Sequence, residues 1–208
     1  MFKLYYAPGT CALASHIALQ EAGAAYTTER IDFKSNQQNS PEYLAINPKG
    51  RVPALVTDRG ILTETPAMLA FIAQSFPQTK LAPLDDPYTF AQVQAFNSYL
   101  CSTVHVAHAH KTRSYRWATD QASFADMKRL VPKTVGASFA LIERDMLKGP
   151  WVMGDTYTIC DPYLFTLAQW LEGDGVDLST LPRVMGHRKR MSERPAVRKV
   201  MAEHLTPA

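Results

Sequence analysis

The hydrophobic pattern of the chain changes near residue 78. Before that point, short apolar runs typical of buried strands alternate with segments whose apolar residues recur every three or four positions, as on one face of a helix. The runs predict strands over 2–6, 26–31, 52–57 and 61–63, and the periodic segments predict helices over 11–22, 41–44 and 64–76. The order indicates an α/β unit with a parallel strand pair, a right-handed crossover and a final antiparallel hairpin.

A different organisation follows this unit. The stretch from Pro77 to Pro87 is rich in proline, so we predict a domain over 1–78, a linker over 79–87 and a second domain over 88–208. Strand signals vanish in the second domain, which is therefore predicted to be all-helical. Its helices are expected over 88–109, over 123–147, from Thr158 onward, and after Pro182 and Pro195.

Composition and charge narrow the function classes. The 208 residues are 46% hydrophobic and 20% charged, as in ordinary globular proteins, and no apolar run approaches the roughly 18 residues of a membrane span. The net charge of +3 argues against nucleic acid or a membrane surface as a partner. The first residues make a poor signal peptide. Three widely separated cysteines favour reduced thiols, so a cytoplasmic location is expected.

Cys11 is the strongest candidate for chemistry. The turn residues before it allow Thr10 to cap the first helix, which places Cys11 in the first helical turn. The positive end of the helix dipole at that position can lower a thiol pKa from ~8.5 to around 4–7. The alternative is a small, buried and inert cysteine. Ala14 stands where a C-x-x-C motif would have its second cysteine.

Four motifs resemble those of the cytosolic glutathione transferases, most closely the bacterial beta class. They are YAPGTCALASH over 6–16, NPKGRVPAL over 47–55, LTET over 62–65 and GDTYTICD over 154–161, the last resembling a folding motif of the family. The resemblance spans essentially the whole chain in the right order. It implies a thioredoxin-like N-terminal domain with a mixed four-stranded sheet, an all-helical C-terminal domain and a homodimer.

The activity that the resemblance implies is detoxification chemistry. Glutathione, a co-substrate rather than a cofactor, would be activated as its thiolate to attack a small hydrophobic electrophile, with or without mixed-disulfide chemistry at Cys11. The alternatives are glutathione-dependent disulfide reduction, or a non-catalytic protein of the same fold that binds hydrophobic ligands. A structural or regulatory role has no supporting surface feature.

The resemblance also assigns roles to individual residues. Cys11, Tyr6 as a hydrogen-bond donor to the sulfur, and His105 would be catalytic. Alternation along the strand lets only one of Tyr5 and Tyr6 face the site, and Tyr6 is alternatively a core residue. The glutathione-binding set would comprise Val52 with a cis bond to Pro53, Glu64 for the ammonium, Thr65 for the γ-glutamyl carboxylate and Lys34 for the glycyl carboxylate. Ser98 and Ser102 would complete the set, either within one chain or from the partner subunit.

The segment that follows the first long helix would border the electrophile. Arg113, Tyr115 and Trp117 suggest an aromatic pocket with a cationic wall, suited to an acidic or planar co-substrate, with surface packing as the alternative. His105 and His108 are three positions apart on a predicted helix, but nothing nearby completes a ligand set. No metal is therefore expected.

Overall fold

A four-stranded mixed sheet organises the N-terminal half of the computed structural model, which describes residues 1–205. Strand β1 (Phe2–Tyr6) pairs in parallel with β2 (Tyr26–Arg30) and antiparallel with β3 (Ala54–Thr57), which turns back into β4 (Gly60–Thr63). The strand order is β2-β1-β3-β4. The predicted parallel pair and terminal hairpin are both confirmed.

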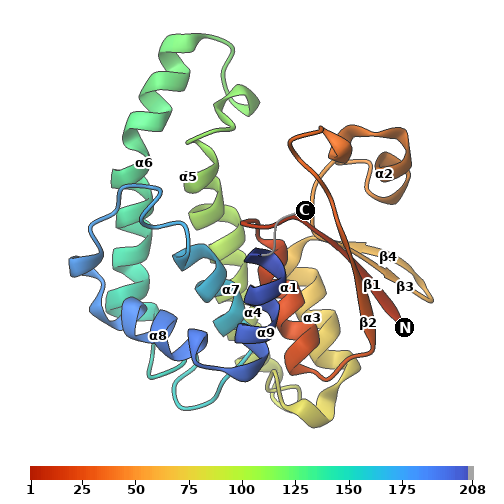
Figure 1. The fold of residues 1–208 in the computed structure, drawn as a ribbon. Helices are drawn as coiled ribbons and strands as arrows, with labels where there is room; N and C mark the ends of the chain where they lie inside the picture. Colours follow the sequence, from red (N-terminus) through yellow and green to blue (C-terminus); the bar gives the residue numbers. More distant parts are fainter. Residues whose placement is uncertain (206–208) are drawn as a thin grey trace.

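Three helices belong to this half. Helix α1 (Ala12–Glu21) connects the parallel strands, α2 (Pro41–Ile46) precedes β3, and α3 (Thr65–Ser75) follows β4. Local chemistry fixes their ends: the Ser40 hydroxyl accepts the Tyr43 N–H at 3.2 Å, and Gly23 has a φ of 63° just after α1. Helices α1 and α3 lie between the sheet and the helical half (Figure 1).

The rest of the described chain is helical apart from loops and one isolated bridge, as predicted. Its α-helices are α4 (Pro87–Tyr99), α5 (His105–Ala109), α6 (Gln121–Leu141), α7 (Cys160–Ala168), α8 (Pro182–Ser192) and α9 (Pro195–Leu205). The helix predicted over 88–109 contains a wider π-turn, η3 (Leu100–Val104), between α4 and α5. A second π-turn, η5 (Ile142–Met146), ends α6. Short 3₁₀ turns are η1 (Gln37–Asn39), η2 (Pro77–Thr79), η4 (Ser114–Arg116) and η6 (Leu178–Thr180).

The segment predicted as a linker is packed against the helical half. Leu81 and Ala82 are buried, and the Leu81 carbonyl accepts the Ile159 N–H at 2.8 Å just before α7. The final three residues of the domain predicted over 88–208 lie outside the described residues.

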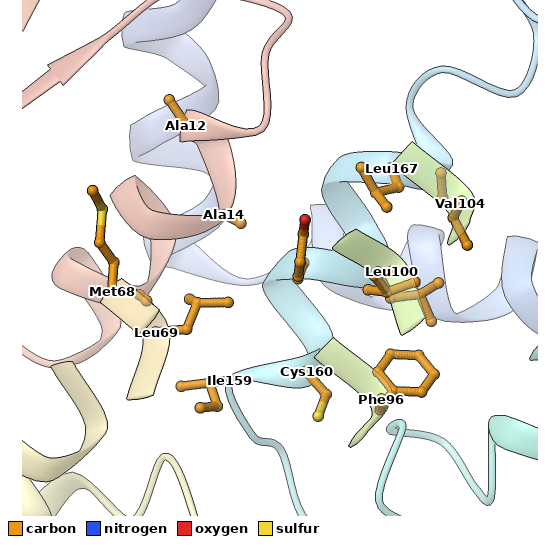
Figure 2. Packing of buried hydrophobic residues seen from close by; sticks show 14 of the residues in the cluster. Ala12, Ala14, Met68, Leu69, Phe96, Leu100, Val104, Ile159, Cys160 and Leu167 are labelled. Carbon is orange, nitrogen blue, oxygen red and sulfur yellow. The ribbon is translucent and has the colours of Figure 1, made fainter. Parts of the chain in front are cut away.

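One hydrophobic core crosses from the first half to the second. Figure 2 shows Ala14 of α1 and Leu69 of α3 facing Leu100 of η3 and Leu167 of α7. Every residue of α1 from Ala12 to Leu19 is buried, because α1 packs on α3 on one side and on α7 and α9 on the other.

A buried carboxylate secures the start of α7. Asp161 is fully buried and accepts the backbone N–H groups of Val152 at 2.8 Å and Thr158 at 2.6 Å. His187 of α8 lies 2.9 Å from the same carboxylate. The bond from the Thr158 N–H to Asp161, three positions later, is the contact of a capping box at the predicted start of this helix.

Candidate active site

A cavity of about 640 Å³ lies between the two halves of the molecule. The sheet half contributes Cys11, Val52 and Thr65 to its lining, and the helical half contributes His105 and Arg113. Residues far apart in the sequence are therefore brought to one place that can hold a small molecule.

Cys11 lies at the start of α1 and is half-buried. Its Sγ donates to the Val52 carbonyl at 3.6 Å, and the Thr65 side chain also hydrogen-bonds to the thiol. Thr10 partly plays the predicted capping role, since its hydroxyl accepts the Ala12 N–H at 3.3 Å, although Cys11 itself occupies the cap position.

The environment of Cys11 does not lower the thiol pKa, and of the two interpretations of the sequence it favours the buried cysteine. Burial raises the pKa of Cys11 to about 11, and the hydrogen bond from Thr65 and the charge of Arg113 offset this only in part. Desolvation of the sulfur therefore outweighs the helix N-terminus. Cys11 is a neutral thiol at physiological pH, able to donate a hydrogen bond.

The turn before β3 forms one wall of the cavity. The Val52–Pro53 bond is cis, as expected from the sequence, and both residues line the cavity. The preceding carbonyl, of Arg51, accepts from Tyr43 Oη at 2.7 Å and Asn47 Nδ2 at 2.6 Å, which holds the turn in place.

The start of α3 continues this wall. Glu64 occupies the N-cap position, although its side chain makes no capping hydrogen bond. Its positive φ of 71° is unusual for a residue other than glycine, and such values are found preferentially at functional sites. Its carboxylate pairs with Lys49 Nζ at 2.5 Å, and Lys49 also donates to the Thr63 hydroxyl at 2.6 Å. Thr65, the next residue, is 4% exposed at the cavity.

His105 faces the cavity from the opposite side. Its ring centroid lies 5.0 Å from that of Trp170 and 6.4 Å from that of His108. Burial, and then the neighbouring cations, lower the pKa of His105 to about 4. The imidazole is therefore neutral near pH 7, and it can exchange hydrogen bonds with a ligand sulfur but supplies no positive charge.

Tyr6 is not where the resemblance placed it. Its side chain is outside the cavity lining, with ring centroids 4.7 Å from His204 and 5.6 Å from His16. The strand alternation is real, since Tyr5 points to the other face and packs on Tyr43. The face that receives Tyr6 is the one covered by α1 and α9, so Tyr6 is a core residue.

Three further residues of the predicted glutathione set lie outside the cavity. Lys34 is exposed, and the loop that carries it turns Phe33 and Asn39 toward the cavity instead. Ser98 and Ser102 are exposed on the outer surface of the α4–η3 helix, where the Ser102 hydroxyl donates to the Ser98 carbonyl at 2.8 Å. None of these three residues is part of the cavity lining.

The predicted electrophile wall does reach the cavity. Arg113, Tyr115 and Trp117 all line it, together with Arg116, whose guanidinium lies 5.9 Å from the centroid of the Tyr115 ring. These residues follow α5 and surround the short turn η4, so they face the cavity from the helical side.

Sequence reasoning missed Tyr163 and Trp170, which line the cavity from α7 and the turn after it. Trp170 Nε1 donates to the Gly9 carbonyl at 3.1 Å, and its ring stacks on His108 with centroids 4.1 Å apart. Tyr163 is hydrogen-bonded to Cys101, a second thiol in the lining. The fixed start of α7 is the only sequence signal that could have suggested them, because it sets which face of that helix is buried.

Neither a cluster of metal ligands nor a membrane-spanning helix is found among the described residues. Residues 1–205 hold no group of three or more His, Cys, Asp or Glu side chains arranged to bind a metal ion. None of the helices in that range combines the length and the apolar character needed to cross a membrane.

Comparisons with known proteins agree with the fold. Residues 1–74 match the family model for the glutathione S-transferase N-terminal domain. The chain is 32% identical to glutathione S-transferase GstA of Escherichia coli O157:H7, covering 96% of this chain and 97% of that protein. A solved glutathione transferase homologue from sulfitobacter, with bound glutathione, is 45% identical with a TM-score of 0.95 over 99% of both chains. A bacterial beta class glutathione S-transferase from Sphingomonas chungbukensis is 30% identical, with a TM-score of 0.85 over 98% of both chains.

Proposed function

The chain belongs to the glutathione transferase family, and we propose that it conjugates glutathione, bound along the sheet side of the cavity, to a small electrophile held against the helical side. One observation carries the proposal. Cys11, Val52, Glu64 and Thr65 form one wall of a single cavity whose opposite wall holds His105, in a chain 45% identical to a structure with glutathione bound.

The sheet wall offers groups that complement a tripeptide. The Val52 backbone can pair with the cysteinyl backbone of glutathione as an added strand does. The Thr65 hydroxyl and the N-terminus of α3 suit the γ-glutamyl carboxylate, and Glu64 suits the ammonium. Lys49 already holds the Glu64 carboxylate, so this side chain is oriented before a ligand arrives.

The sulfur of glutathione would then lie beside Cys11 and His105. A neutral Cys11 thiol can donate a hydrogen bond to a glutathione thiolate, and the positive end of α1 and the Arg113 charge stabilise that thiolate further. Its proton passes to water. The raised pKa of Cys11 supports conjugation over disulfide reduction, because the latter needs Cys11 itself as a thiolate nucleophile.

The proposal also covers the transferase class, the oligomeric state and the cellular location of the protein. Cys11 at the head of α1 and the similarity to a beta class enzyme support membership of that class. Ser98 and Ser102, exposed outside the cavity, are available to a partner subunit in a homodimer. Three free cysteines support a reducing, cytoplasmic location.

The test measures steady-state conjugation of glutathione to a neutral chlorodinitrobenzene. The wild type should turn it over, and Glu64→Ala should raise the KM for glutathione about tenfold or more, because it removes a charged partner of the ammonium. Glu29→Ala is the matched control: Glu29 also pairs with a lysine at 2.5 Å and is similarly exposed, but it lies outside the cavity. Its KM should stay within twofold of the wild type.

Two companion measurements separate the alternatives. Retention on immobilised glutathione with no mass increase after incubation with oxidised glutathione supports conjugation. A gain of one glutathionyl group that Cys11→Ala abolishes would instead favour disulfide chemistry. If the protein shows neither retention nor turnover, the alternative of a non-catalytic protein that binds hydrophobic ligands is favoured.

A further inference from the structure

The charges around the cavity do not balance. Within the described residues, its lining carries one carboxylate, from Glu64, and four permanent cations: Lys49, Arg51, Arg113 and Arg116. Lys49 is paired with Glu64, but none of the three arginines has a carboxylate partner among residues 1–205. A cavity that keeps three unpaired guanidinium groups at its wall favours an anionic ligand.

Arg113 is the most telling of the three. It is half-buried, its backbone N–H donates to the Ala109 carbonyl at 2.8 Å at the end of α5, and the next residue, Ser114, is buried and donates to the His110 carbonyl at 2.5 Å. These two hydrogen bonds therefore fix the backbone at Arg113. Burial and the nearby charges of Arg116 and Arg51 lower the pKa of Arg113, which nonetheless stays protonated.

The position of Arg113 indicates which ligand it serves. Its charge acts on Cys11 as well as on His105, so it lies close to the place proposed for the glutathione sulfur. It projects from the helical wall, whereas the tripeptide would occupy the sheet wall. Arg51 adjoins Val52 and lines the cavity from the sheet wall, where the tripeptide would lie.

Aromatic surface lies next to the arginine. Tyr115 is 64% exposed and Trp117 is 46% exposed, and both line the cavity. The Trp117 ring is fixed edge-on to His110, with centroids 4.4 Å apart. Exposed aromatic faces beside a guanidinium suit a flat molecule with a negative group at one end.

We propose that the second substrate is a planar electrophile bearing a carboxylate, which Arg113 and Arg116 bind while Tyr115 and Trp117 contact its flat face. The inference rests on the proposed function and makes its substrate class specific. It replaces the small hydrophobic electrophile expected from the family resemblance with an anionic one.

The test compares a chlorodinitrobenzoate with its neutral methyl ester. In both, the glutathione thiolate attacks the ring carbon that bears chlorine, a C–S bond forms, and the C–Cl bond breaks with its electron pair leaving on chloride. The wild type should prefer the benzoate over the ester in kcat/KM. Arg113→Gln should reduce that preference about tenfold to a hundredfold, because a charge-assisted hydrogen bond is lost, and Arg113→Lys should restore part of it.

Arg129→Gln is the matched control, because Arg129 is an exposed arginine on α6 paired with Asp126 and lies outside the cavity. It should leave the preference unchanged. An unaltered preference in Arg113→Gln, with a raised KM for glutathione, would overturn the inference and assign Arg113 to a glutathione carboxylate. A wild type with no preference would also overturn it.

Failure of the proposed function is recognised separately. If neither compound is turned over, conjugation is contradicted, and the anion site is then tested by calorimetry with the benzoate and S-methylglutathione present together. Binding that is weakened at least tenfold in Arg113→Gln would keep the anion site. Equal binding by both proteins, or no binding by the wild type, would remove it.

Discussion

The buried histidine pair that receives Tyr6 should make the fold sensitive to acid. His16 is fully buried and His204 is 7% exposed, and His16 Nδ1 lies 3.1 Å from His204 Nε2. One nitrogen must donate and the other accept, so the contact requires at least one neutral ring. Burial is the main cause that lowers the pKa of His16 to about 3 and of His204 to about 4.

The sign and size of the effect follow from these values. Both folded pKa values lie below the ordinary value of 6.5, so the contribution to stability is complete above that pH and is lost as the pH falls toward about 4. At pH 5 the unfolded chain binds a proton at each site and the folded chain does not. At about 1.4 kcal/mol per pKa unit, the pair costs about 4 kcal/mol at pH 5 relative to pH 8.

Urea unfolding followed by tryptophan fluorescence measures this cost. The quantity compared is the drop in unfolding free energy between pH 8 and pH 5. A lower absolute stability of a variant therefore does not affect the comparison. The variant His16→Gln/His204→Gln should show a drop about 4 kcal/mol smaller than the wild type. His110→Gln, outside the pair, should match the wild type. A double variant within about 1 kcal/mol of the wild-type drop would refute the reasoning.

Three other predictions concern single side chains. Asp161→Ala should lower the unfolding free energy by about 3–5 kcal/mol in urea titrations, because it strands the buried Val152 and Thr158 N–H groups and His187. Asp177→Ala removes an exposed helix cap and should lower it much less. Equal losses in the two variants would show that burial of Asp161 does not matter. Iodoacetamide should alkylate Cys11 about tenfold faster per pH unit from pH 7 to 9, because the thiol pKa is about 11. Intact mass measures the rate, with Cys11→Ala as the control. A rate that levels off below pH 8 would show that Cys11 is a thiolate. Trp170→Phe removes the N–H donor to Gly9 while keeping a ring over His108. It should raise the Kd for glutathione about threefold to fivefold in calorimetry. An equal increase in Trp151→Phe, a residue outside the cavity, would show that Trp170 has no special role.

The parts of the fold that sequence predicted well are those fixed by neighbouring residues. Ser40 caps α2, Gly23 ends α1 and Asp161 reaches back to Thr158, and each contact spans no more than a few positions. The wide turn η3 was not predicted, because one extra residue in a helical turn leaves the spacing of apolar side chains almost unchanged.

Site residues were predicted correctly where a motif fixes the backbone, and were missed where tertiary packing decides which side chains line the cavity. Val52, Thr65 and His105 reach the cavity as expected. The resemblance supplied Tyr6 as a residue but could not say which face of β1 meets the site. The pKa of Cys11 depends on how much of the assembled protein surrounds the sulfur. Trp170 contacts Gly9 across 161 positions, a separation at which no local pattern carries information.

The double burial of α1 has a consequence for how such a protein can diversify. A helix enclosed by α3 on one side and by α7 and α9 on the other belongs to both halves at once, so the boundary near residue 78 is no place to cut or to recombine the chain. A chimera that joins one member's first half to another's second half must match the partners of α1, or both halves lose their core. New substrates are more easily acquired by exchange of the loop from Arg113 to Trp117, which lies away from the core around α1.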